Sequence, residues 1–266
     1  MPEQPSFRAS PLTCVVERFG AADVTTEPFP HYHLENVFPD EYYQALLRYL
    51  PGSTVYQNLF EASSLKLDHF RYRDQRDLVE GWTDNLPDEL RAFWNDFNKW
   101  FLGPDLASAV LDSFAEPLHV RFGPKKSWPA VSVEAQLIRH RAGYFLGPHS
   151  DLHTKLVVLL IYLARDDSAK HLGTSLYLPK EPGFGCPNST HYPFHDFVKV
   201  KTLPFKPNSL LGFVRSDVSF HGVEPLSEKD CTTCSRDLIQ YVLYDKQARE
   251  AQLRARTFHN HQGAGE

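Results

Sequence analysis

The sequence predicts a mainly β core packed against an N-terminal helical region, and two patterns carry this prediction. After Gly123-Pro124 the chain reads as short strands separated by turns, which is typical of an all-β sandwich or barrel. Before that point, apolar residues recur at helical spacing. The length of 266 residues suits one large β domain with additions or two small domains. We expect one compact unit (1–266), divided into a helical or mixed support region (1–125), a β core (126–245) and a charged C-terminal tail (246–266).

The N-terminal region is expected to contain three helices after an extended start. Residues 1–30 hold several prolines without sustained periodicity, which favours an extended lead-in or an edge strand. A first helix should begin with Asp40 as its N-cap and end at Pro51-Gly52, because the apolar residues between them lie on one helical face. Pro87 should open a second helix whose wide aromatic stripe we assign to packing. A shorter third helix is expected over 106–114.

The β core is expected to hold at least six strands. The pattern is clearest at 197–203, where Val198, Val200 and Thr202 alternate with lysines, as in a half-buried strand. The expected strands cover about 132–141, 156–163, 174–178, 197–203, 209–215 and 236–244.

Composition narrows the class of function. A formal net charge of −5 provides no basic surface of the kind that binds nucleic acid. The chain has no stretch of about 18 apolar residues that could span a membrane, and Met1–Ser6 lacks the features of a signal peptide. Four cysteines do not form a disulfide scaffold in a chain of this length. Cys231 and Cys234 form a lone CxxC without a second ligand pair, which we interpret as part of a loop. We expect a soluble, cytoplasmic protein without a nucleic-acid or membrane partner.

Candidate metal ligands lie at His149, Asp151 and His221. The first two stand two residues apart at the mouth of an apolar run, and residues i and i+2 of a strand point the same way. A third ligand would complete the two-histidine, one-carboxylate facial triad of non-heme Fe(II) oxygenases. His221 supplies that ligand if a double-stranded barrel brings the two segments together.

Arg236 opens the last expected strand and offers a carboxylate-binding group. The fixed fork of an arginine binds a carboxylate through two hydrogen bonds. If Arg236 points into the barrel, Leu238 and Gln240 point the same way; the alternative is a surface arginine at a strand start. His31 and His33 form another histidine pair, which we interpret as structural and partly exposed because no third ligand with suitable spacing lies nearby.

Taken together, these segments resemble the iron(II)- and 2-oxoglutarate-dependent dioxygenases, within the group that includes the prolyl hydroxylases. Their order and spacing match that family from about residue 130 to 245, and the N-terminal half matches only as a helical support region. The segments that carry the resemblance are His149-Ser150-Asp151, Ile161-Tyr162-Leu163, Gly173-Thr174-Ser175-Leu176, Pro207–Phe213, His221-Gly222-Val223-Glu224-Pro225 and Arg236 with its strand.

The resemblance implies a jelly-roll-like, cupin-like double-stranded β-helix packed against N-terminal helices. It implies Fe(II) bound by His149, Asp151 and His221, with Arg236 on the distal carboxylate of 2-oxoglutarate. Tyr162 matches the place of a tyrosine that hydrogen-bonds the same carboxylate. No catalytic residue beyond the metal ligands is implied. O2 would be the second co-substrate, with ascorbate a candidate reductant.

The chain departs from the family pattern at one position and leaves another open. The family usually has a Gly-Gly pair before its middle strand, where this chain has Leu172-Gly173-Thr174, which touches no expected ligand. Relatives often place a further residue for 2-oxoglutarate on the strand before the His-x-Asp motif. Gln136, Arg139, His140 and Arg141 are all candidates for that role.

The implied reaction couples oxidative decarboxylation of 2-oxoglutarate, to succinate and CO2, with hydroxylation of an unactivated C–H bond. The intact Asp151 favours hydroxylation, desaturation or demethylation over halogenation. We expect a small-molecule substrate, such as an amino acid or a natural-product intermediate, with a protein side chain second. Residues 183–192 are a candidate substrate wall or a surface insertion, and residues 53–84, where loop and short strand both fit, are a candidate lid.

Two other interpretations stay open. A cupin-type metal protein without 2-oxoglutarate chemistry would need the triad but would have no use for Arg236. A non-catalytic member could bind a ligand or a partner on the same scaffold, because fold does not fix function. The complete triad counts against that second alternative. The sequence does not indicate an oligomeric state.

Overall fold

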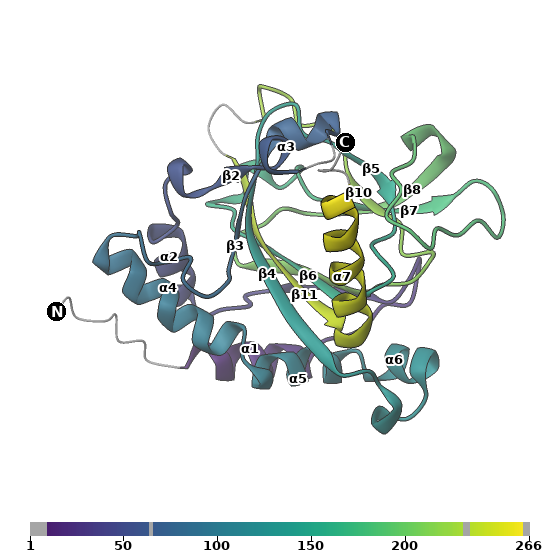
Figure 1. The fold of residues 1–266 in the computed structure, drawn as a ribbon, viewed down its shortest axis with the longest axis horizontal. Coiled ribbons are helices and arrows are strands. Elements are labelled where there is room, and N and C mark those ends of the chain that lie inside the picture. Colours follow the sequence, from purple (N-terminus) through teal and green to yellow (C-terminus); the bar gives the residue numbers. More distant parts are fainter. Residues whose placement is uncertain (1–9, 64–65, 231–234, 263–266) are drawn as a thin grey trace.

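The computed structural model describes residues 10–63, 66–230 and 235–262, so the expected Cys231–Cys234 loop lies outside the described part (Figure 1). The described residues form seven α-helices and eleven β-strands. The helices are α1 (Pro11–Gly20), α2 (Asp40–Arg48), α3 (Leu59–Ala62), α4 (Asp88–Phe101), α5 (Pro104–Ser113), α6 (Ala115–Phe122) and α7 (Lys246–Gln262).

The strands form two antiparallel sheets. The larger has the order β1-β9-β6-β11-β4-β3-β2 and the smaller the order β5-β10-β7-β8. The strands are β1 (His31–Glu35), β2 (Gln57–Asn58), β3 (Arg73–Asp77), β4 (Val131–His140), β5 (Leu146–His149), β6 (Lys155–Tyr162), β7 (Thr174–Pro179), β8 (Phe197–Leu203), β9 (Ser209–Val214), β10 (His221–Val223) and β11 (Arg236–Asp245).

From β4 onward, the chain passes back and forth between the two sheets. β4, β6, β9 and β11 belong to the larger sheet, and β5, β7, β8 and β10 to the smaller one. This interleaving makes the two sheets the walls of one flattened barrel. The expected double-stranded β-helix is therefore confirmed, and the six expected strands lie within one or two residues of their predicted positions.

The central strand β6 consists almost entirely of apolar residues because both of its faces are covered. Alternate side chains of a strand point to opposite faces. Val157 and Leu159 join the cluster that includes the N-terminal helices, whereas Val158 and Leu160 join the cluster between the sheets. Because helices cover one face of the larger sheet and the smaller sheet covers the other, both faces of β6 are buried.

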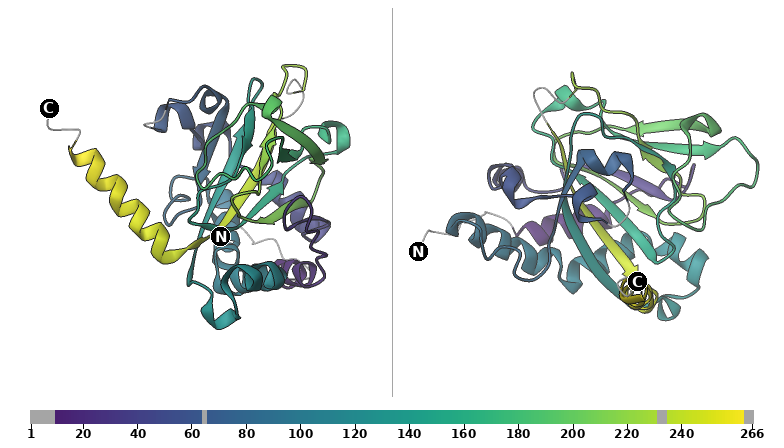
Figure 2. Two further views of the ribbon diagram at one scale, coloured as in Figure 1. Left: turned by 90° about the vertical axis from the view of Figure 1, so that its right-hand side faces the viewer. Right: turned by 45° about the horizontal axis from the view of Figure 1, so that its top comes forward.

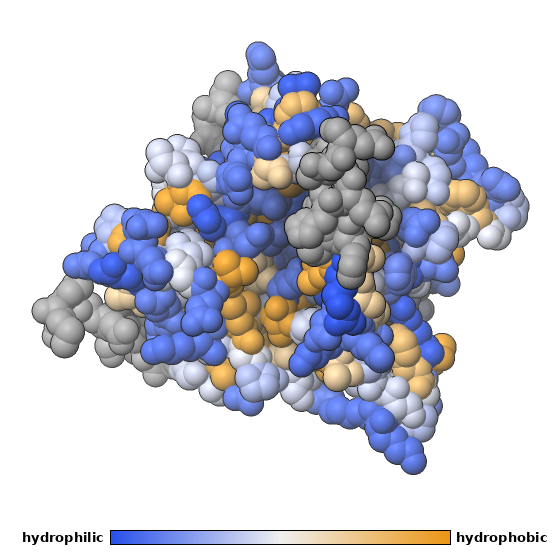
Figure 3. Space-filling view, in the orientation of Figure 1, coloured by the Kyte–Doolittle hydropathy of each residue, from blue (hydrophilic) through white to orange (hydrophobic). Residues whose placement is uncertain are grey.

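The helical layer lies along the outer face of the larger sheet (Figures 1 and 2). The aromatic stripe of α4 packs into this layer as predicted, and the indole of Trp94 donates a hydrogen bond to the Tyr49 carbonyl oxygen at 2.7 Å. Phe101 of α4 contacts Tyr241 of β11 with ring centroids 5.1 Å apart. In the space-filling view this side is mostly hydrophilic, with apolar residues gathered between α4 and α7 (Figure 3).

The N-terminal region differs from expectation at α1, at α6 and at the starts of α2 and α4, where Pro87 is the N-cap rather than the first residue of α4. Residues 11–20 form α1 rather than an extended lead-in, because Ser10 caps the helix, Pro11 suits its first turn, and Val15 and Phe19 are buried on one face. Pro39 rather than Asp40 is the N-cap of α2, and no side chain caps that end. Residues 115–122 add the helix α6, which the sequence analysis did not predict.

The support region also supplies strands to the larger sheet. β1 pairs with β9, and β3 pairs with β4. His31 lies on β1 and is buried rather than partly exposed, with Nδ1 2.8 Å from the Phe29 carbonyl oxygen, which fits the structural role predicted for the His31–His33 pair.

The C-terminal segment forms the helix α7, which leans away from the body of the molecule (Figure 2). Near its start, Arg249 makes two hydrogen bonds to the Glu134 carboxylate at 2.6 and 2.7 Å, which tie the helix to β4. Among the described residues, no helix has both the length and the apolar character that a bilayer span requires.

Candidate metal centre

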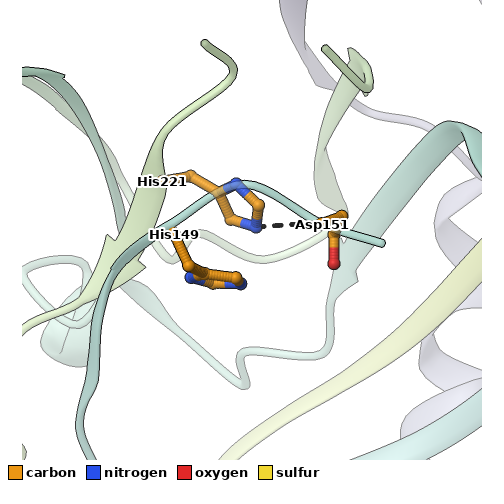
Figure 4. A group of neighbouring side chains, drawn as sticks. All are labelled: His149, Asp151 and His221. Carbon is orange, nitrogen blue, oxygen red and sulfur yellow. Dashed lines mark ion pairs between the residues drawn. The ribbon is translucent and has the colours of Figure 1, made fainter. Parts of the chain in front are cut away.

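The smaller sheet and the loop that follows β5 bring His149, Asp151 and His221 together (Figure 4). His149 ends β5 and His221 begins β10, and the two are cross-strand partners in the smaller sheet. Asp151 follows two residues after His149. One candidate ligand atom from each residue lies within 4.8 Å of the other two. The register of β5 against β10 therefore joins segments that are far apart in the sequence.

Backbone contacts set the proton positions of both imidazoles. His149 Nδ1 lies 3.1 Å from the Gly147 carbonyl oxygen, and His221 Nδ1 lies 3.0 Å from that of Ser219. Since a carbonyl only accepts, each Nδ1 donates its proton and each Nε2 keeps a free lone pair. Metal-binding histidines commonly make this contact with a backbone carbonyl.

The Asp151 carboxylate completes the group of candidate ligand atoms. Its Oδ2 is buried, has no hydrogen-bond partner among the described residues, and lies 3.7 Å from His221 Nε2. An unsatisfied buried carboxylate oxygen beside two imidazole lone pairs is costly unless a cation is bound. The three residues thus fit a divalent metal ion, and the open side of such a triad suits Fe(II).

Two basic residues hold Asp151 in place. Lys155 Nζ donates to Asp151 Oδ1 at 2.6 Å in a largely buried ion pair. Arg215 Nε donates to the backbone carbonyl oxygen of Asp151 at 2.9 Å. Because Oδ1 is engaged by Lys155, only Oδ2 faces the two imidazoles.

The protonation states suit metal binding near neutral pH. Burial lowers the pKa of His149 well below its ordinary value, and His221 adds to that effect. Burial likewise lowers the pKa of His221. For Asp151, burial alone would raise the pKa, but the Lys155 ammonium and the two imidazoles outweigh it and hold the pKa below its ordinary value. The centre thus presents two neutral imidazoles and one carboxylate.

Arg236 points into the barrel rather than toward solvent. Its side chain is buried, with Nε 2.7 Å from the Leu172 carbonyl oxygen, Nη2 2.9 Å from Thr174 Oγ1, and Nη1 2.8 Å from His140 Nδ1. These contacts use three of its five N–H donors. No carboxylate among the described residues lies within ion-pair distance of it, so a charged, partly unsatisfied guanidinium faces the interior.

Tyr162 reaches the same group through Thr174. Its hydroxyl donates to Thr174 Oγ1 at 2.9 Å, and the Arg236 guanidinium lies 5.6 Å from its ring centroid. The side chain is buried but does not line the cavity described next. A direct contact between Tyr162 and a carboxylate stays a prediction.

One cavity of about 920 Å³ connects the triad with Arg236. Leu238 and Gln240 line it with Arg236, as strand alternation predicted. Leu59 and the segments 67–75 and 189–194 contribute further parts of its wall. The region proposed as a lid and the loop proposed as a substrate wall therefore both border this cavity.

The four candidates near the end of β4 separate by strand face. Gln136 and His140 line the cavity. Arg139 lies on the opposite face, with Nε 2.8 Å from Asp237 Oδ1, and Arg141 is an exposed residue beyond the strand that pairs with Asp74. His140 is the candidate that contacts Arg236, and its ring stacks on Tyr144 with centroids 3.6 Å apart.

Sequence reasoning missed several residues of the cavity. Lys155 carried a weak signal, because it lies four residues after Asp151 at the start of an apolar run. His69, Arg73 and His191 carried none, since their place in the cavity depends on long-range pairing and loop packing.

Comparison with solved structures finds similar folds at low sequence identity. A prolyl hydroxylase from Trichoplax adhaerens, in complex with a hypoxia inducible factor oxygen degradation domain peptide fragment, aligns with a TM-score of 0.51 and 16% identity, over 90% of this chain and 91% of that chain. A Pseudomonas putida prolyl-4-hydroxylase aligns with a TM-score of 0.46 and 13% identity, over 89% of this chain and 100% of that chain. A Burkholderia pseudomallei oxidoreductase of the 2OG-Fe(II) oxygenase family aligns with a TM-score of 0.38 and 14% identity, over 80% of this chain and 93% of that chain.

No family model and no curated protein matches the chain. The structural likeness therefore concerns the fold alone. This chain has the double-stranded β-helix fold of the Trichoplax prolyl hydroxylase.

Proposed function

We propose that this chain is an Fe(II)- and 2-oxoglutarate-dependent dioxygenase that hydroxylates an unactivated C–H bond of a small molecule, with release of succinate and CO2. The observation that carries the proposal is one cavity holding both a two-histidine, one-carboxylate triad and a buried arginine without a carboxylate partner. The triad would bind the metal. The arginine would bind a carboxylate through its free N–H groups.

Each part of the chain has a defined task in this proposal. His149, Asp151 and His221 would hold Fe(II), which supplies the oxidative chemistry when bound together with 2-oxoglutarate and O2. Arg236 would position the distal carboxylate of 2-oxoglutarate, and Thr174 would fix the orientation of the guanidinium. The apolar barrel wall, Leu59 and the segments 67–75 and 189–194 would limit the access of water to the reacting atoms.

The contacts of Arg236 favour this function over the two rival interpretations. A cupin-type metal protein would have no need for a buried guanidinium, which is costly to desolvate without a partner. A non-catalytic scaffold would have no need for the free ligand atoms of all three triad residues. The cavity volume of about 920 Å³ lies in the range of small-molecule sites, which supports a small molecule over a protein side chain as substrate. A cytoplasmic location and a requirement for ascorbate remain predictions.

Succinate formation tests the proposal. Protein purified without oxygen is supplied with Fe(II), 2-oxoglutarate and a metabolite pool, and succinate is measured after air is admitted. We expect iron-dependent succinate in the wild type and none in Asp151→Ala. Absence of iron-dependent succinate from the wild type with every pool, or equal amounts from Asp151→Ala, would contradict the proposal.

A further inference from the structure

We propose that Arg73, with His69 and His140, forms a second anion site in the same cavity, and that this site binds the carboxylate of an apolar carboxylic acid substrate. The inference rests on the proposed function, because it names the class of molecule that would be hydroxylated. It assigns the substrate carboxylate to Arg73 and leaves Arg236 to 2-oxoglutarate.

The first argument is the charge of the cavity wall. Four cationic side chains line it, but two of them have partners: Lys155 pairs with Asp151, and Arg249 pairs with Glu134. The other two are Arg236 and Arg73, and no carboxylate among the described residues lies within ion-pair distance of Arg73. Its Nη2 donates to Gln136 Oε1 at 3.2 Å, a neutral acceptor. Two positive charges without a carboxylate partner therefore face one cavity.

The second argument is a cluster of unsatisfied nitrogen atoms. Arg73 Nε, His69 Nε2 and His140 Nε2 are all buried and have no hydrogen-bond partner among the described residues. The side chains of His69 and His140 are themselves more than nine-tenths buried. Since His140 Nδ1 accepts a hydrogen bond from Arg236, its Nε2 carries the proton and is a donor. Unsatisfied buried polar atoms are rare in native proteins. A carboxylate would accept from Arg73 Nε and His140 Nε2, and from His69 Nε2 when that nitrogen carries the ring proton.

The third argument is strand register. His140 of β4 is the Cα partner of Arg236 on β11 and also of Arg73 on β3, so the three residues form one row across three strands. Neighbouring strands lie roughly 5 Å apart, which separates the two arginine backbones by about 10 Å. Each guanidinium can therefore serve a different carboxylate, with His140 between them.

The fourth argument concerns 2-oxoglutarate itself. This molecule has two carboxylates, of which one would lie at the metal and the other at Arg236. None remains for Arg73, so an anion bound there would belong to another molecule.

Apolar side chains next to Arg73 indicate the body of that molecule. Leu59, Leu67 and Phe70, from the segments around β3, line the cavity together with Ile138 of β4. A molecule with an apolar or aromatic body and one carboxylate would bury its body against these residues and satisfy the unpaired donors.

The experiment compares phenylacetate with its neutral analogue phenylacetamide. The protein is loaded with Zn(II), which supports no redox chemistry, and with saturating 2-oxoglutarate to fill Arg236. Each probe is then titrated by calorimetry into the wild type, Arg73→Gln and the control Arg71→Gln. Arg71 is an exposed residue in the same segment that does not line the cavity, so it matches the change of charge.

We expect saturable binding of phenylacetate to the wild type and roughly 10- to 100-fold weaker binding of phenylacetamide, the range for loss of a hydrogen bond to a charged group. Arg73→Gln should abolish this preference and change the affinity for 2-oxoglutarate less than about threefold, while Arg71→Gln should match the wild type. No saturable binding of phenylacetate to the wild type, or a preserved preference in Arg73→Gln, would overturn the anion site. The anion site would also be overturned if Arg73→Gln lost its affinity for 2-oxoglutarate but still preferred phenylacetate to phenylacetamide, because Arg73 would then bind the co-substrate.

A measurement on the wild type covers the case in which Arg73→Gln does not fold. The Arg73 Nε–H signal in a proton–nitrogen NMR spectrum should shift on saturation with phenylacetate, and an unmoved signal would contradict the site. Repeating the phenylacetate titration without metal and 2-oxoglutarate tests the anion site separately from the proposed dioxygenase function. Arg73-dependent phenylacetate binding in a protein that fails to bind 2-oxoglutarate would contradict the proposed function and leave the anion site intact.

Discussion

Replacing Arg236 with methionine removes the buried guanidinium and keeps an unbranched side chain. Truncating one partner of a buried, hydrogen-bonded charge pair costs about 2–5 kcal/mol of binding free energy. At about 1.4 kcal/mol per tenfold, the lower figure weakens 2-oxoglutarate about 30-fold. Arg236 is fully enclosed and oriented by three hydrogen bonds, so we expect at least this loss.

Ligand-induced stabilisation measures this effect without turnover. At a 2-oxoglutarate concentration of about 100 times the wild-type Kd, the metal-loaded wild type should gain about 2.7 kcal/mol of unfolding free energy. Arg236→Met, with a Kd about 30-fold higher, should gain about 0.9 kcal/mol or less. Arg141→Met serves as a control, since Arg141 is exposed and pairs with Asp74. Equal stabilisation of Arg236→Met and the wild type would refute the assignment of Arg236.

Three further predictions concern the ion pair, a buried histidine and a close backbone contact. Lys155→Met removes the cation that holds Asp151 Oδ1, so divalent metal should bind about 10- to 100-fold more weakly; calorimetric metal affinity equal to that of the wild type would count against this role. Burial, together with His69, lowers the pKa of His191 to about 4. Between pH 4 and about pH 6.5 the unfolded chain therefore binds more protons than the folded chain. The free energy of unfolding consequently falls as the pH drops through this window. His191→Gln should reduce the slope of unfolding free energy against pH there by up to about 1.4 kcal/mol per pH unit, and an unchanged slope in urea denaturation would be inconsistent with the burial argument. A Cβ at Gly173 would lie 1.9 Å from the Leu203 carbonyl oxygen, so Gly173→Ala should push the start of β7 away from β8. We expect the free energy of unfolding to fall by about 1–3 kcal/mol or more, and an unchanged midpoint of urea denaturation would contradict this prediction.

The strands of the β core could be predicted because their pattern is local. β6 and β11 are long apolar runs between turns, and the alternation of β8 places its valines and lysines in a strand. The sequence analysis did not predict the helix α1 because prolines surround that segment, although Ser10-Pro11 is typical of a helix start. The N-cap of α2 could not be placed more closely, since helix ends are set by backbone geometry that neighbouring residues share.

The candidate site divides in the same way. Strand alternation led to the pair of His149 and Asp151, although β5 ends at His149 and Asp151 lies in the loop after it. Family resemblance led to His221 and Arg236, so the sequence could predict the grouping of the three residues and the inward direction of the guanidinium. Arg73 enters the cavity only because β3 pairs with β4, a contact that places Arg73 opposite His140, 67 residues later in the chain (140 − 73 = 67). No local periodicity encodes such a pairing, so residues 53–84 could not be interpreted from the sequence.

An anaerobic Fe(II) titration tests the metal centre most directly. In the presence of saturating 2-oxoglutarate, the wild type should bind one ferrous ion per chain, and His221→Ala should lose most of that affinity because one of three ligands is removed. A control variant at the structural His31 should bind as the wild type does. Full binding by His221→Ala, or no stoichiometric binding by the wild type, would contradict a metal ion held by His149, Asp151 and His221.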